Sequence, residues 1–124
     1  MKETEEDLSN LTFNHAELLA RVDNDRELLY DLLAIFKEVF PRQLQALGEA
    51  VESGDGKLVA VAAHTLKGML LNLAAGQAAT AAGRLEQLGR SGETSGFQDA
   101  FAAFEKDAMR LLLQLDACMA EVHG

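Results

Sequence analysis

The sequence is poor in the residues that brace small proteins with disulfides or large aromatic rings. Its 124 residues include no tryptophan, one proline and one cysteine, and aromatic residues make up 6% of the chain. The lone cysteine, Cys118, excludes an internal disulfide and fits a reducing compartment, so we expect a cytoplasmic protein. No apolar run approaches the roughly 18 residues of a membrane span. The acidic start, MKETEED, lacks the apolar core of a signal peptide.

Positive charge is also scarce. The chain has 11 basic and 20 acidic residues, which gives a formal net charge of -9 at pH 7. Nucleic acids and anionic membrane surfaces both require a basic contact surface. The charge balance therefore argues against nucleic acid and membrane as partners, and we expect a monomer whose partners are other proteins.

Alanine and leucine are what the sequence has in abundance. Apolar residues make up 48% of the chain, and few of them are β-branched, which is typical of an all-α protein. At this length we expect one domain with one core. Residues 1–11 are expected to be a disordered acidic tail or a linker remnant, and residues 12–124 the folded domain.

Apolar residues recur at spacings of three and four, the period of amphipathic helices. The pattern predicts one short helix followed by long ones that form an antiparallel four-helix bundle, with the short N-terminal helix across one end. The expected ranges are 15–22, 25–52, 58–75, 77–90 and 97–121.

Several residues mark where the helices begin and end. Asp23 or Asn24 is expected to cap the long second helix, and Asp55 the helix after it, because their side chains accept hydrogen bonds from free backbone N–H groups. Gly76 is expected to supply the turn that follows residues 58–75.

The single proline, Pro41, falls inside the apolar repeat of the long second helix. Proline removes one helical hydrogen bond and disfavours helical backbone at the residue before it. We therefore expect either a kink near Val39 or two helices that meet there.

The helix expected over residues 58–75 carries a histidine opposite its apolar stripe. At 100° per residue, that stripe consists of Leu58, Ala62, Leu66, Met69 and Leu73, with Val59 and Leu70 at its margin. His64 lies nearly opposite, so we expect it to be exposed. Its own face carries Ala60, Val61, Lys67, Gly68, Leu71 and Ala75.

These neighbours suggest chemistry at His64. A neutral imidazole is a nucleophile near neutral pH and can take a phosphoryl group from an acyl phosphate. Lys67, one turn on, can neutralise the phosphoryl oxygens. Glycine inside a helix costs about 0.5–1 kcal/mol, and core packing does not explain Gly68 on the exposed side. It is explained if a partner approaches closely there, and Val61 and Leu71 would form an apolar docking patch.

The segment AHTLKG, with Leu85-Glu86 further along, resembles the histidine-containing phosphotransfer (HPt) domain of multistep phosphorelays. The likeness covers about residues 12–120 and includes the segment Phe13 to Lys57, with its LLxRV opening and the FxxxFP of its long helix. It implies a helical bundle whose exposed histidine exchanges a phosphoryl group with receiver-domain aspartates. By position, His64 is the phosphoacceptor, Lys67 the cation beside the phosphoryl group and Gly68 the site of close approach.

The resemblance also implies where partners dock. Glu86, Gln87 and Arg90 fall on the outer face of the fourth helix, which in the family lies beside the histidine. The expected partners are response-regulator receiver domains and, for some members, a hybrid sensor histidine kinase. No cofactor is expected on this chain, and Mg²⁺ is expected on the receiver.

Two positions depart from the usual HPt pattern. Met69 follows Lys67-Gly68, where the family often has a small residue. Ala74 follows Asn72-Leu73, where the family often has glycine. Neither departure touches the three residues that carry the resemblance.

Three classes of function compete. The first is a phosphorelay carrier, which forms a covalent intermediate but is not an enzyme with turnover of its own. The second is an enzyme, but the Glu-x-x-His pairs of di-iron bundles and a nucleotide-binding motif for a kinase are both absent from the sequence. The third is a degenerate HPt-like adaptor that binds receiver or kinase domains without phosphotransfer. The presence of His64, Lys67 and Gly68 favours the first class.

Overall fold

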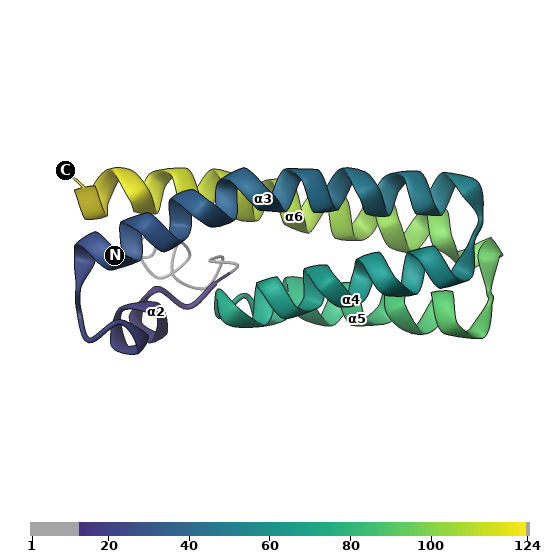
Figure 1. Ribbon diagram of the computed structural model, residues 1–124, viewed down its shortest axis with the longest axis horizontal. Coiled ribbons are helices and arrows are strands. Elements are labelled where there is room, and N and C mark those ends of the chain that lie inside the picture. The colour runs from purple at the N-terminus through teal and green to yellow at the C-terminus, as the bar shows by residue number, and fades with distance from the viewer. Residues whose placement is uncertain (1–12, 124) are drawn as a thin grey trace, which may run out of the picture.

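The computed structural model describes residues 13–123 and is built from helices packed side by side (Figure 1). The elements in chain order are α2 (His15–Arg21), α3 (Arg26–Ser53), α4 (Gly56–Asn72), α5 (Gly76–Ser91), the 3₁₀ turn η1 (Thr94–Gly96) and α6 (Phe97–His123). The predicted all-α bundle is therefore confirmed. The predicted acidic tail, residues 1–11, lies outside the described residues.

The long helices form two neighbouring pairs. Figure 1 shows α3 running along α6, and α4 running along α5, with consecutive helices antiparallel. The α3–α6 pair extends beyond the α4–α5 pair at one end, and the short helix α2 lies at that end. Within residues 13–123, none of the helices is both long and apolar enough to cross a membrane.

Acidic and amide side chains cap the first three helices. Asn14 caps α2 and Asp55 caps α4, each accepting a backbone N–H at 3.0 Å. The expected cap of α3 was wrong by one or two residues. Asp23 and Asn24 take left-handed backbone, with φ of 53° and 62°, and Asp25 accepts the N–H of the helix instead. The two residues turn the chain because Asp and Asn tolerate this conformation.

The long helix α3 continues through Pro41 without a break, so the alternative of two helices is wrong. Side chains on both sides of the proline anchor the helix in the core. Phe36 and Phe40 stack on each other with ring centroids 4.7 Å apart, and Leu44 is buried one turn further on. Burying such side chains contributes about 1.5–3 kcal/mol each, enough to offset the roughly 3 kcal/mol that an internal proline costs.

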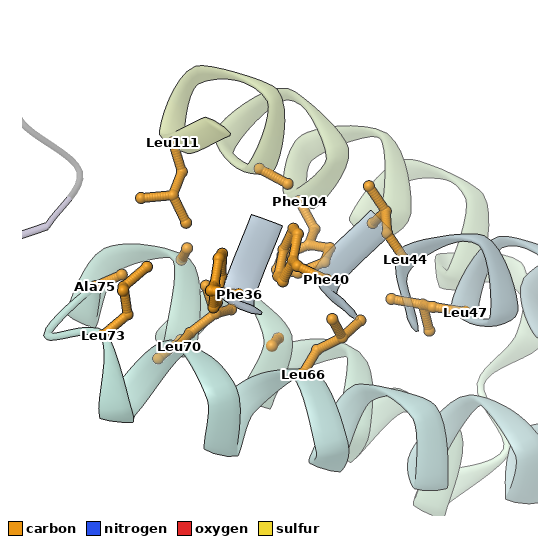
Figure 2. Packing of buried hydrophobic residues seen from close by; sticks show 14 of the residues in the cluster. Phe36, Phe40, Leu44, Leu47, Leu66, Leu70, Leu73, Ala75, Phe104 and Leu111 are labelled. Carbon is orange, nitrogen blue, oxygen red and sulfur yellow. The ribbon is translucent and has the colours of Figure 1, made fainter. Parts of the chain in front are cut away.

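The core lies between α3, α6 and the inner faces of α4 and α5, where aromatic and leucine side chains interdigitate (Figure 2). The inner face of α4 differs from the predicted stripe. Its buried residues are Val59, Ala63, Leu66 and Leu70, whereas Leu58 is 53% exposed. Leu66 and Leu73 are buried as predicted, and Ala62 and Met69 are half-buried against the core. The stripe is thus rotated toward its predicted margin. Leu32 and Val39, which belong to the apolar repeat of α3, are likewise exposed, although the repeat predicts that they are buried.

Two glycines bring α4 and α5 into backbone contact. A Cβ atom on Gly56 would lie 2.5 Å from the carbonyl oxygen of Gly89. A Cβ atom on Gly89 would lie 2.6 Å from the oxygen of Gly56 and 2.7 Å from the nitrogen of Ala60. Neither position has room for any larger residue, so the helices cross as closely as their backbones allow. The crossing, at Gly56 and Ala60, lies one to two turns before His64 on α4.

The C-terminal end of α4 is closed by α2. Arg21 donates to the carbonyl oxygens of Leu71 at 3.2 Å and Asn72 at 2.8 Å. A guanidinium at this end satisfies free carbonyls and opposes the negative end of the helix dipole. The chain then turns at Ala74, whose φ is 58°, and not at Gly76, which begins α5. The expectation for Gly76 was therefore wrong.

The left-handed backbone at Ala74 generates a prediction about stability. This conformation costs an alanine about 1–2 kcal/mol, and glycine avoids the cost but loses more backbone entropy on folding. We expect Ala74→Gly to raise the free energy of unfolding by about 0.5–1 kcal/mol, measured by urea denaturation.

Gly54 is the matched control for this change. It caps the C-terminal end of α3 with φ of 72°, and a Cβ atom there would meet nothing within 4 Å. Gly54→Ala should therefore lower the free energy of unfolding by about 1 kcal/mol through backbone strain alone. A loss of stability in Ala74→Gly would contradict the assignment of strain to Ala74.

Candidate functional site

His64 stands on the outward face of α4, with 67% of its side chain exposed. The predicted exposure is confirmed. The helix places Val61 and Leu71 on the same face, 66% and 53% exposed, because positions three, four and seven residues apart share one side of a helix. Gly68 is exposed one turn after the histidine, and a Cβ atom there would meet nothing within 4 Å.

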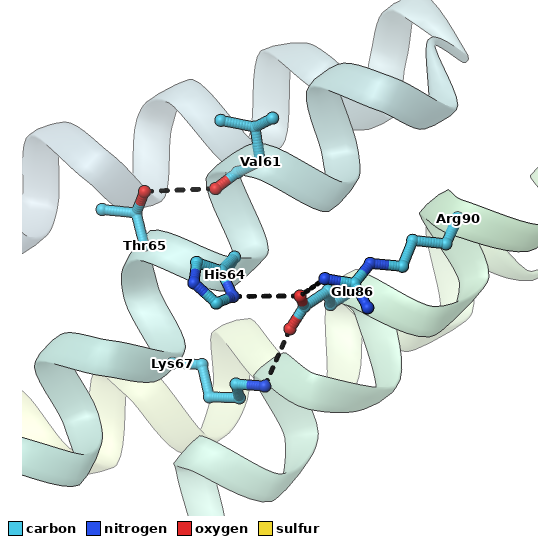
Figure 3. A network of polar contacts seen from close by, with 6 residues as sticks. All are labelled: Val61, His64, Thr65, Lys67, Glu86 and Arg90. Atoms are coloured by element: carbon cyan, nitrogen blue, oxygen red, sulfur yellow. Dashed lines mark hydrogen bonds and ion pairs between the residues drawn. The ribbon is translucent and has the colours of Figure 1, made fainter.

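A buried carboxylate on α5 holds the imidazole from behind (Figure 3). Glu86 is 4% exposed and is the one buried charged residue among those that the structure describes. Its Oε2 lies 3.0 Å from Nδ1 of His64 and 2.5 Å from Nη2 of Arg90, and its Oε1 lies 2.9 Å from Nζ of Lys67. One carboxylate therefore joins three side chains that surround the outward face of α4.

The position of Glu86 corrects the sequence analysis, which placed it with Gln87 and Arg90 on an outer docking face. Gln87 and Arg90 are exposed as expected, but Glu86 points toward α4. The reason is its spacing. Ala82, Glu86 and Gly89 are four and three residues apart, so they form the row of α5 that packs against α4. That row of small residues around a glutamate was the available signal, and the close helix crossing that buries it was not visible.

The surroundings of Glu86 keep it ionised. The hydrogen bond from Lys67 lowers the pKa of the carboxyl below its ordinary value. Burial acts in the opposite direction, but the hydrogen bond from His64 and the positive charges of Arg90 and Lys67 add to the lowering of the pKa.

An ionised carboxylate fixes the tautomer of the histidine. A carboxylate accepts hydrogen bonds and cannot donate them, so Nδ1 of His64 must carry the proton at the 3.0 Å contact. In the neutral ring, Nε2 then has a free lone pair. Because Nδ1 is held against α5, Nε2 lies on the exposed side of the ring (Figure 3). The neutral ring thus has its unprotonated nitrogen on the exposed side.

The absence of a side chain at Gly83 leaves room for Lys67 to reach the carboxylate of Glu86. A Cβ atom on Gly83 would lie 3.5 Å from Cδ of Lys67, so the stem of the lysine crosses α5 above this glycine. The side chain of Lys67 is 34% exposed, which leaves its ammonium group between the carboxylate and solvent. The sequence analysis did not single out Gly83, because a lone glycine in a helix carries no specific signal.

A shallow hollow of about 290 Å³ lies beside the histidine, lined by Ala60, Val61, His64, Thr65, Glu86 and Arg90. Ala60 is half-buried at its floor, and Leu71 is exposed further along α4. Ala75, expected on the same face, is instead buried where α5 begins, because α4 ends at Asn72. Among residues 13–123, no cluster of three or more histidine, cysteine or acidic side chains could hold a metal ion.

The sequence matches the profile of the Hpt domain over residues 31–124. No curated protein matches the chain. The fold resembles the crystal structure of histidine-containing phosphotransfer protein B (HptB) from Pseudomonas aeruginosa PAO1, with a TM-score of 0.81 and 20% identity, covering 88% of this chain and 95% of that one. Because the profile spans most of the sequence, the chain belongs to the Hpt domain family, whose members carry phosphoryl groups in phosphorelays.

Proposed function

We propose that Nε2 of His64 accepts a phosphoryl group from the aspartyl phosphate of a receiver domain and passes it to another receiver aspartate. The observation that carries the proposal is the pairing of an exposed imidazole with a buried carboxylate. His64 is 67% exposed while Glu86 beneath it is 5% exposed, which leaves Nε2 both reachable and unprotonated in the neutral ring. A solvated surface histidine would need no such support.

The chemical step needs no base on this chain. The lone pair of Nε2 attacks phosphorus, and the bond from phosphorus to the aspartate oxygen breaks, which releases the aspartate as a carboxylate. The imidazole becomes a positively charged ring that keeps its proton on Nδ1, 3.0 Å from the carboxylate of Glu86. That negative charge stabilises the positive ring as it forms. Transfer in the other direction follows the same path reversed.

Two cationic side chains lie close enough to His64 to contact the transferred phosphoryl group. Lys67 and Arg90 both contact Glu86, and their exposed fractions of 34% and 63% leave them open to a phosphoryl group on Nε2. Their charges would offset those of the phosphoryl oxygens, so catalysis consists of positioning and charge neutralisation. We propose that Mg²⁺ arrives with the receiver and that this chain binds no cofactor of its own.

The wider setting is part of the same proposal. The partners are receiver domains, and a hybrid sensor kinase is the other candidate donor. The chain acts as a monomeric cytoplasmic carrier without turnover of its own, in keeping with a single cysteine, Cys118, that is buried and free. Docking uses the exposed apolar residues Val61 and Leu71, with Gly68 at the point of closest approach.

The first prediction concerns the phosphorylated atom. Purified chain mixed with receiver domains charged by acetyl phosphate should gain acid-labile label, and ³¹P and ¹⁵N NMR should place it on Nε2 of His64. His64→Gln should abolish the label. The matched controls His15→Gln and His123→Gln should keep it, since these histidines lie elsewhere in the chain. If several receivers fail to label the wild type, the chain is instead an adaptor without phosphotransfer.

The second prediction concerns Glu86 as a positioning residue. Glu86→Gln removes the charge that holds the Nδ1–H tautomer, and a charge-assisted hydrogen bond contributes about 1.5–3 kcal/mol. We expect transfer to slow by about tenfold or more. The ¹⁵N shifts of His64 should show more of the Nε2–H tautomer. Glu105→Gln makes the same charge change at an exposed site on α6. It should alter neither the transfer rate nor the tautomer of His64.

The same variant has a stability signature that depends on pH. Because the folded-state pKa of Glu86 is below its ordinary value of 4.5, its charge stabilises the fold above that pH, and the contribution is lost as pH falls through the folded pKa. Glu86→Gln should therefore cost about 1–2 kcal/mol at pH 7 and progressively less below pH 4.5. A constant difference across this range would contradict an ionised Glu86.

The third prediction separates stability from docking at Gly68. The position has open space around it, so Gly68→Ala should raise the free energy of unfolding by about 0.5–1 kcal/mol. Gly68→Gln should fold equally well but lose most phosphotransfer, because its side chain occupies the space of the partner. Ala102→Gln, at an exposed position on α6, should leave transfer intact. Unchanged transfer by Gly68→Gln would refute the close approach.

A further inference from the structure

Positive charge gathers on two of the helices. Together α4 and α5 contain four of the 11 basic residues of the chain but only one of its 20 acidic residues. Their combined formal charge is therefore +3, and the remaining seven basic and 19 acidic residues give the rest of the chain -12. The net charge of -9 hides this division.

Three of the four basic residues lie on the outward face that carries His64. Lys57 is exposed seven residues before the histidine, two helical turns away, and so lies on the same outward stripe of α4. Lys67 and Arg90 flank the imidazole through their contacts with Glu86. The fourth, Arg84, is exposed on α5.

Acidic groups around this face are few. Glu86 is buried, and its charge is offset by Lys67 and Arg90. Glu49 of α3 lines a hollow together with Val61 and Thr65. Asp55 caps α4 and Glu93 follows α5, so both lie at the end of the helix pair that Lys57 also occupies. His64 is in the middle of α4. In contrast, α3 and α6 each contain five acidic residues.

We propose that the outward face of α4 and α5 is an electropositive docking surface for a protein surface rich in carboxylates around a phosphorylated aspartate. The inference rests on the proposed function and adds how the partner is selected and oriented. Opposite charges across an interface raise association rates and fix orientation. The acidic helices α3 and α6 repel the same partner, so it approaches the His64 face first. A long nucleic acid would touch the acidic surface as well and is disfavoured.

The range of the effect is set by salt. Exposed charges act over about 8 Å at physiological ionic strength and about 3 Å at 1 M salt. Steering by a few lysines and arginines should therefore be strong in dilute buffer and nearly absent in concentrated salt. Direct contacts at the histidine should change much less.

The first test needs no partner. Paramagnetic relaxation of backbone amides is measured on the full chain with an anionic and a cationic nitroxide of matched size. The anionic probe should relax outward amides of α4 and α5 more than the cationic probe does, and the order should reverse on α3 and α6. The same order on all four helices would overturn the electropositive face and leave phosphotransfer unaffected.

The second test uses a charged receiver domain and follows the second-order transfer rate. The rate should fall about fivefold or more between roughly 0.05 and 0.5 M salt. Lys57→Glu should lower the low-salt rate severalfold and match the wild type at high salt. The fold should survive, since a negative charge is favourable in the first turn of a helix.

Lys106→Glu is the matched control, because it makes the same charge change at an exposed site on α6. Its transfer rate should stay within about twofold of the wild type. Equal effects of the two variants, or a transfer rate that ignores salt, would overturn this inference while His64 remains the phosphoacceptor. Absence of transfer from every receiver would overturn the proposed function, and the partner named here with it.

Discussion

The site depends on one buried carboxylate between two helices. Glu86 accepts a hydrogen bond from Nδ1–H of His64 on one oxygen and contacts the ammonium of Lys67 with the other, while Arg90 contacts the first oxygen from the outer side. Removing an unpaired carboxylate from water costs several kcal/mol, so its three partners are a condition of its burial. The histidine gains its orientation from that requirement. With fewer hydrogen-bond donors around it, the carboxylate of Glu86 would have to stay exposed to water, and the imidazole of His64 would be free to rotate.

The close crossing of α4 and α5 makes this geometry possible. Gly56 and Gly89 meet backbone to backbone, and an added Cβ atom at either one would lie within 2.7 Å of backbone atoms. Glutamate has a short side chain, so it reaches across to α4 only where the helices are this near. Gly83 likewise leaves room for the side chain of Lys67, whose aliphatic stem lies above it. The glycines in these helices thus lower the helix propensity, but they allow the short distances between the side chains of the site.

The sequence was sufficient to predict the bundle and the exposure of His64, and insufficient to predict the buried carboxylate behind it. Periodicity located the helices because apolar residues repeat at three and four positions over long stretches. It located most of the buried stripe of α4 but included Leu58 and left out Ala63, because alanine and valine lie on several sides of that helix and the pattern is weak there. Val59 and Ala63 are buried while Leu58 is exposed, an outcome decided by how closely α5 approaches. The spacing of apolar residues predicts the repeat within a helix, but it does not predict which helices come into contact.

The same gap explains Glu86. A charged residue is placed outward by default, because burial without partners is costly. Its partners come from another helix, 22 positions away for His64, and no local pattern relates them. Arg21 is a parallel case, since it closes the end of α4 from 50 residues away. In both cases the sequence contained the residues but not the pairing.

The ion pairs of Glu86 also affect how readily the proposed carrier releases its phosphoryl group. In the proposed reaction Lys67 and Arg90 are shared between two acceptors, because they contact Glu86 before the phosphoryl group arrives. A cation already paired with a carboxylate stabilises a new anion less than a free one would, since each added contact weakens an existing one. Glu86 therefore aids attack through the Nδ1 proton and limits how tightly the product is held. A relay needs this balance, because binding the intermediate too well would stop the transfer that follows.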